Sequence, residues 1–142
     1  MKIGLITDTH LGERAPALNA NARAAMAFFD KVGAGLAIHL GDVTLDAPAR
    51  PEELDFAKGL FAGFRTPVRC IPGNHDIGDN PGGEADPDHP APDARRLAAW
   101  RQRFGDDRWA AESDGWTMIG LNASCLVSAT PRSRPNSNGS RA

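Results

Sequence analysis

The chain has 142 residues, of which 41% are hydrophobic and 24% charged, so one soluble globular domain with its own core is expected. Its formal net charge of -2 gives no electrostatic reason to expect a nucleic acid or an anionic membrane as partner. No apolar run approaches the roughly 20 residues of a membrane span, and the N-terminal apolar run is too short for a signal peptide. We therefore expect a cytoplasmic protein that binds a small molecule.

The first half of the chain predicts two consecutive strand-helix-strand units. A strand over residues 2–7 precedes a helix with one apolar face, which Gly33 ends. A second strand over residues 36–40 leads to a helix that opens at Pro51, and a third strand covers residues 68–71. Because each connection is long enough for a helical crossover, the three strands are expected to be parallel.

The second half predicts a loop, a helix and a hairpin. The proline- and glycine-rich residues 78–92 are expected to form a loop that flanks or covers the site. Asp93 can cap a helix that ends at Gly105. Strands over residues 108–112 and 116–121, joined by an Asp-Gly turn, predict a β-hairpin. Two tryptophans are expected to pack in this hairpin: Trp109 and Trp116.

Three polar strings follow the three predicted parallel strands, at spacings of 34 and 32 residues: Asp8-Thr9-His10, Gly41-Asp42 and Gly73-Asn74-His75-Asp76. Because the carboxyl ends of parallel strands meet at one sheet edge, their carboxylate, imidazole and amide groups should converge there. Oxygen and nitrogen donors without thiolate suit manganese, iron, zinc, cobalt or nickel better than calcium. The pattern therefore predicts a metal site.

The spacing also suggests how two divalent ions would be held. Asp8 and His10 leave one turn and can converge on a first ion, which Asp42 from the adjacent strand can also reach. Asp42 can bridge to a second ion, and Asn74 would serve that ion. Two ions about 3.5–4 Å apart can hold a hydroxide and polarise a phosphoryl oxygen, so phosphoester hydrolysis is the expected reaction.

The remaining histidines and Asp76 are expected to have roles other than metal binding. His75 is expected to protonate a departing alkoxide, with Asp76 orienting it. His39 is expected to be a hydrogen-bonded strand residue, and His89 an exposed loop residue. Taken singly, Asp8, Asp42 and Asn74 fit turn or capping roles, but their common register favours a metal site.

The three strings, in this order and spacing, resemble the first three signature blocks of calcineurin-like metallophosphoesterases, and the resemblance covers roughly residues 1–126. It implies an α/β fold, the N-terminal half of a two-sheet sandwich flanked by helices. It also implies two divalent metal ions, held by the ligands named above, with His75 as proton donor and Asp76 supporting it. Within the family, the likeness is nearest to bacterial members that resemble class III cyclic-nucleotide phosphodiesterases.

The chain departs from the family pattern after its first half. Family members continue with a further histidine and a Gly-His-x-His block, and this sequence has neither. Both metal sites are therefore expected to be incomplete, through a truncated or frameshifted reading frame or in a genuine short variant. The alternative function is an inactive fragment or binding module that holds metal or phosphate weakly. Residues 127–142 are expected to be a disordered tail.

An incomplete two-sheet core has a consequence for solution behaviour. Apolar faces and a strand edge would be left exposed to solvent. Self-association through the exposed sheet, or poor solubility, is therefore expected. No nucleic acid or membrane partner is expected.

Overall fold

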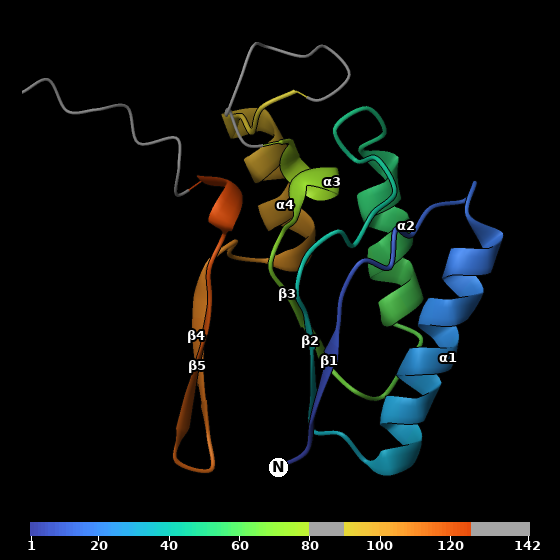
Figure 1. Cartoon of the computed structure of the whole chain (residues 1–142), viewed down its shortest axis with the longest axis vertical. Helices are drawn as coiled ribbons and strands as arrows, with labels where there is room; N and C mark the ends of the chain where they lie inside the picture. The colour runs from blue at the N-terminus through green and yellow to red at the C-terminus, as the bar shows by residue number, and fades with distance from the viewer. Residues whose placement is uncertain (80–89, 126–142) are drawn as a thin grey trace, which may run out of the picture.

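The computed structural model describes residues 1–79 and 90–125, and its centre is a three-stranded sheet (Figure 1). The strands are β1 (Ile3–Ile6), β2 (Leu36–His39) and β3 (Val68–Cys70). All three run parallel, with β2 in the middle. The predicted parallel sheet and the α/β fold class are confirmed, and each strand is slightly shorter than predicted.

The two crossover helices lie on the same side of this sheet (Figure 1). They are α1 (Pro16–Val32) and α2 (Glu52–Phe61). Proline opens α1 at a position where its missing N–H breaks no helical hydrogen bond. Gly33 ends α1 with a left-handed φ of 66°, which glycine adopts without steric cost. The core between helices and sheet includes apolar residues from both layers: Ala22, Met26, Ala37, Leu54, Ala57, Leu60 and Cys70.

Two further helices follow β3. A single-turn helix, α3 (Asn74–Ile77), stands where only a polar string and a loop were expected. The longer α4 (Ala94–Phe104) begins as predicted, because the Asp93 side chain accepts a hydrogen bond from the Arg96 N–H at 2.7 Å. Trp100 of α4 is fully buried and stacks on Phe104, with ring centroids 4.6 Å apart. This helix thereby joins the core beside α2.

The predicted hairpin is present and precedes a short 3-10 turn. It consists of β4 (Trp109–Ser113) and β5 (Trp116–Gly120), and η1 (Ala123–Cys125) follows. Its two turn residues, Asp114 and Gly115, have φ values of 52° and 79°. Positive φ at both positions is what a two-residue type I′ hairpin turn requires, and Asp-Gly is a preferred pair for it.

One of the two hairpin tryptophans packs as predicted. The Trp109 indole N–H donates to the Cys70 carbonyl at 2.9 Å, and the Arg69 guanidinium lies 5.2 Å from its ring centroid. Trp116 is 76% exposed, so the prediction that it packs is wrong. It pairs with Ser113 beside the turn, at the opposite end of the hairpin from the pair that contains Trp109. The sequence pattern identified the strand that carries Trp116, but it could not show that this end of the hairpin lies exposed to solvent.

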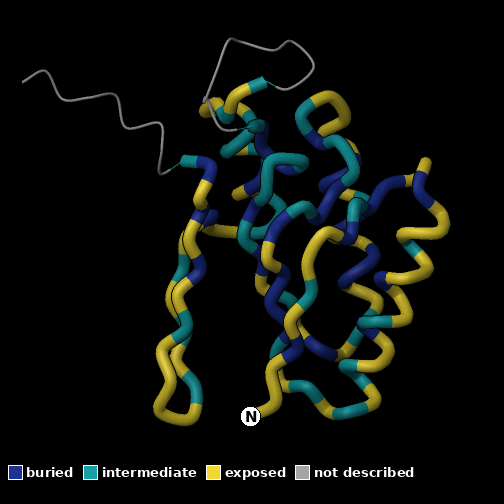
Figure 2. Tube along the Cα trace, in the orientation of Figure 1, coloured by how far each residue is buried: buried dark blue, intermediate teal, exposed yellow. Residues whose placement is uncertain are grey.

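Exposed positions run along much of the hairpin, as Figure 2 shows. Several large apolar side chains of the sheet, its loops and the hairpin are about half exposed or more: Leu5, Leu40, Trp116, Ile119 and Leu121. In the described part of the chain, no helix is long and apolar enough to cross a membrane. The centre of the predicted loop, with His89, and the predicted tail at 127–142 lie outside the described residues.

Candidate metal centre

The loops that carry the predicted ligands lie side by side at the carboxyl edge of the sheet. Their main chains continue the parallel pairing beyond the strands. The N–H of Asp8 donates to Gly41 O and that of His10 to Asp42 O, both at 3.1 Å, and an isolated bridge pairs Leu11 with Thr44. The first two strings are therefore held in a fixed register.

Three of the predicted ligands adopt an unusual backbone conformation. The φ values of Asp8, His10 and Asp42 are 54°, 44° and 53°. Residues other than glycine rarely adopt a positive φ. Those that are held in this conformation cluster at functional sites. The candidate ligands thus occupy backbone positions that the surrounding contacts must maintain.

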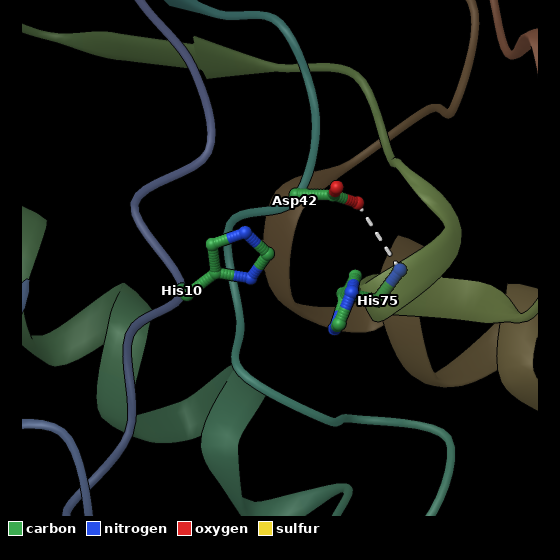
Figure 3. A group of neighbouring side chains, drawn as sticks. All are labelled: His10, Asp42 and His75. Carbon is green, nitrogen blue, oxygen red and sulfur yellow. Dashed lines mark hydrogen bonds between the residues drawn. The ribbon is translucent and has the colours of Figure 1, made fainter. Parts of the chain in front are cut away.

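His10 and Asp42 from two loops and His75 from the short helix α3 come together at this edge (Figure 3). One potential ligand atom from each lies within 4.8 Å of the other two. The two imidazole rings meet edge to face with centroids 4.5 Å apart, and the His75 main-chain N–H donates to Asp42 Oδ1 at 3.1 Å. The strand ends therefore converge as the sequence predicted.

A hydrogen bond to the main chain orients the His75 imidazole. Its Nδ1 lies 2.7 Å from the Leu45 carbonyl oxygen, which can only accept. Nδ1 therefore carries a proton, and in the neutral ring Nε2 is left as the basic nitrogen. The sequence contained no signal for this partner, because a main-chain carbonyl is the same in every residue.

The imidazole of His10 supports the assignment of a metal site. Its Nδ1 is buried and makes no hydrogen bond to the described part of the chain. A buried nitrogen without a partner is unfavourable, and a cation is one group that would complete it. Imidazole nitrogen with carboxylate oxygen is a donor set that suits first-row transition metals. The residues present therefore fit a divalent metal ion.

Glycine at position 73 permits the close approach of the third string to Asp42. A Cβ atom built on Gly73 would lie 2.1 Å from Asp42 Oδ1 and 2.4 Å from Asp42 N. Both separations are far inside van der Waals contact, so any side chain there would displace Asp42 or the loop. In the sequence, Gly73 stands in the third polar string, and nothing there indicates this role.

Asp8 and Asn74 lie beside the three-residue cluster rather than within it. Both line an open cleft of about 700 Å³, together with Asp42 and Gly73. Asp8 Oδ1 is 4.0 Å from His10 Nε2, and its other oxygen accepts a 2.5 Å hydrogen bond from the Thr7 hydroxyl. The structure thus brings all four predicted metal ligands and His75 to one edge of the sheet.

Asp76 has a different role from the predicted one. Its buried carboxylate accepts hydrogen bonds from the main-chain N–H groups of Gly73, Val43 and Thr44 and from the Thr44 hydroxyl, at 2.8–3.1 Å. Burial raises its pKa to about 6, while these hydrogen bonds act in the opposite direction. Asp76 therefore ties the Gly73 loop to residues 43–44 and leaves the orientation of His75 to a carbonyl group.

The reason for this difference is the short helix α3. Successive residues of a helix point about 100° apart, so neighbours in sequence face different surroundings. Asp76 occupies the third position of α3 and reaches back to the N–H that precedes the helix, as in one half of a capping box. His75 faces the cluster, whereas Asp76 faces the interior.

Comparisons with known proteins give one family match. Residues 1–121 match the model of the calcineurin-like phosphoesterase superfamily domain. Among solved structures, the crystal structure of a dimetal phosphatase from Danio rerio is similar, with a TM-score of 0.43 and 19% sequence identity. That similarity covers 51% of this chain and 29% of the other, so this chain matches under a third of that phosphatase. A search of curated proteins finds no match.

Proposed function

The chain belongs to the calcineurin-like phosphoesterase superfamily, and we propose on that basis that it hydrolyses a small-molecule phosphomonoester or phosphodiester with divalent metal ions. The observation that carries the proposal is the approach of His10, Asp42 and His75 to within 4.8 Å of one another. This group stands at the carboxyl edge of a parallel sheet, where α/β proteins commonly bind ligands. The adjoining cleft has room for a substrate.

In this proposal, residues of the cleft, together with His10, would hold two ions. Asp8, His10 and Asp42 would hold one ion, and Asp42 and Asn74 would hold the other. The ions would be manganese, iron, zinc or similar, since the donors are oxygen and nitrogen. Divalent ions in such a site polarise the phosphoryl oxygen and activate water for attack. The predicted bridging role of Asp42 is supported by its place between the loops that follow β1 and β3.

His75 is the proposed proton donor to the leaving group. With Nδ1 held by the Leu45 carbonyl, Nε2 is the nitrogen that can take up a proton and later release it. The imidazolium form would donate that proton to the departing oxygen. Asp76 contributes by tying the start of α3, which carries His75, to residues 43–44, and in the described part of the chain its carboxylate makes no hydrogen bond to the ring.

A second candidate function is weak binding of metal or phosphate without turnover. One observation favours it: among residues 1–79 and 90–125, the candidate ligands form a single group of three. A second ion would then depend on Asp42 and Asn74, with no imidazole of its own. Such a site would hold at most one ion firmly.

Calorimetric titration of manganese into the metal-free chain, followed by hydrolysis of nitrophenyl phosphate esters, separates the two candidates. Binding of two ions per chain and manganese-dependent hydrolysis support the proposed enzyme. Asp42→Asn should then abolish hydrolysis by removing the bridging charge. Asp106→Asn is the matched control, because it removes the same charge from an exposed position beyond α4.

Either of two results would contradict the proposal. Hydrolysis that survives Asp42→Asn would exclude Asp42 as a shared ligand. Binding of one ion or none, without hydrolysis, would favour the second candidate.

A further inference from the structure

We propose that Thr9 and His39 are a pair of positioning residues that hold the Asp8–His10 turn against the Asp42 loop. This inference rests on the proposed metal centre. It assigns a role to two side chains that would themselves bind neither metal nor substrate. Both are buried, with exposed fractions of 7% and 0%.

A short chain of hydrogen bonds links the two loops through these side chains. The Thr9 hydroxyl oxygen lies 2.8 Å from His39 Nε2 and 3.1 Å from the Val43 carbonyl oxygen. The main-chain N–H of Gly41 points at His39 Nδ1 at 3.4 Å. These hydrogen bonds therefore connect Gly41 N to Val43 O, the main-chain groups on either side of Asp42.

A single arrangement of protons satisfies every member of this chain. Because the Gly41 N–H can only donate, His39 Nδ1 accepts, and the neutral ring must carry its proton on Nε2. That proton is donated to the Thr9 oxygen, which leaves the hydroxyl hydrogen for the Val43 carbonyl. Every donor and acceptor in this network is then paired without water, and all its hydrogen bonds are donated in the same direction. The network therefore constrains the two loops strongly.

The place of Thr9 explains why such a constraint is needed. It lies between Asp8 and His10, both of which have positive φ. Residues in that conformation persist only where the surrounding contacts determine it. Main-chain bonds from Asp8, His10 and Leu11 to residues 41–43 supply part of that support, and Thr9 supplies the side-chain anchor between them.

The surroundings of His39 argue against a ligand role. It ends β2, and its ring contacts Phe61 of α2, with centroids 5.9 Å apart. α2 lies on the helical side of the sheet, while Asp42 follows three residues later at the cleft. His39 thus supports the candidate metal centre from the buried end of β2, beside α2.

The first test is manganese affinity by calorimetry, in variants of the 142-residue chain. Thr9→Val removes the hydroxyl at nearly constant volume, and His39→Phe removes both nitrogens but keeps the ring. Each should weaken manganese binding by about 10- to 100-fold, the usual effect of losing a residue that orients a ligand. Thr9→Ser and His39→Gln, which keep the required donor or acceptor, should recover most of the affinity.

Thr66→Val is the matched control. Thr66 is 4% exposed, and its hydroxyl donates to Asp30 Oδ1 at 2.7 Å, beyond the other end of β3. This variant loses one buried hydroxyl but should bind manganese as the unmodified chain does. Equal losses of affinity in Thr66→Val and Thr9→Val would show a general loss of stability and overturn the proposal.

A second test needs no metal. In the metal-free chain, hydrogen exchange of the Asp8, His10 and Leu11 amides should quicken in Thr9→Val and His39→Phe but not in Thr66→Val. Unchanged protection in both would overturn the positioning role, even if manganese binding fell. If the unmodified chain binds no manganese, the proposed function fails, and exchange alone still decides whether the pair holds the loops. If Thr9→Val does not fold, both manganese affinity and hydrogen exchange are compared between His39→Phe and His39→Gln instead.

Discussion

Asp42 and Gly73 approach each other more closely than any side chain at position 73 would allow. Gly73→Ala should therefore displace Asp42, lower the free energy of unfolding by about 1–3 kcal/mol and weaken manganese binding. Urea unfolding and calorimetric titration measure the two effects. The result that contradicts this is a variant with unchanged affinity.

Gly59→Ala is the control for that substitution. Gly59 lies inside α2, and a Cβ there would meet nothing within 4 Å. Alanine is a better helix former than glycine, so this variant should gain about 0.5–1 kcal/mol and bind manganese normally.

The buried imidazole of His39 should make stability depend on pH. Burial lowers its pKa from 6.5 to about 4. As the pH falls from 6.5 to 4, His39 becomes protonated in the unfolded chain but stays largely neutral in the folded chain. The free energy of unfolding therefore decreases. The contribution lost is about 3 kcal/mol at pH 4, and it is fully present above pH 6.5.

The measurement is the difference in unfolding free energy between the unmodified chain and His39→Gln, from pH 4 to pH 7. A difference is needed because Asp76 acts oppositely: its raised pKa stabilises the fold as the pH falls from about 6. Gln does not titrate, so the unfolding free energy of the unmodified chain minus that of the variant should fall by about 3 kcal/mol between pH 7 and pH 4. A difference that is constant with pH would contradict the assignment.

At the scale of elements, Trp109 attaches the β4–β5 hairpin to the end of β3. Its indole N–H bonds to Cys70 O, and a Cβ built on Gly120 would lie 2.5 Å from its ring. Trp109→Phe should lower the free energy of unfolding by about 1–2 kcal/mol, because a hydrogen bond to a buried residue is lost. Trp116→Phe, at a largely exposed position, should change it by less than about 0.5 kcal/mol. Equal effects in urea unfolding would mean that Trp109 is not the anchor.

The elements themselves were largely predictable. Apolar periodicity located both crossover helices and the parallel strands, because each pattern depends on residues close in sequence. The Asp-Gly turn similarly located the hairpin. The single turn of α3 was missed, since four residues are too few to show a helical period.

At the scale of the whole molecule, one side of the sheet carries exposed apolar side chains among residues 1–79 and 90–125. A Cβ on Gly4 would meet Phe29 of α1, so the alternating neighbour Leu5 faces away from the helices. Leu5 is 63% exposed, and Ile119 of the hairpin is 68% exposed. Exposed large apolar side chains promote association where they lie together on one surface.

We therefore predict concentration-dependent self-association, measured by sedimentation velocity. Leu5→Lys and Ile119→Lys should reduce it. Phe28→Lys is the control, because Phe28 is 59% exposed on α1, on the other side of the sheet. A monodisperse monomer that melts cooperatively at all concentrations would contradict the prediction.

The sequence alone determined which groups reach the candidate centre. Asp8, His10, Asp42 and Asn74 follow parallel strands, and parallel strands of similar length end at one edge whatever packs around them. The tertiary structure decided which way each side chain turns. His75 and Asp76 are neighbours in the chain, yet one faces His10 and Asp42 and the other the interior. Direction depends on local φ and on partners such as Leu45 O and the Val43 N–H, which are remote in sequence and leave no pattern in it.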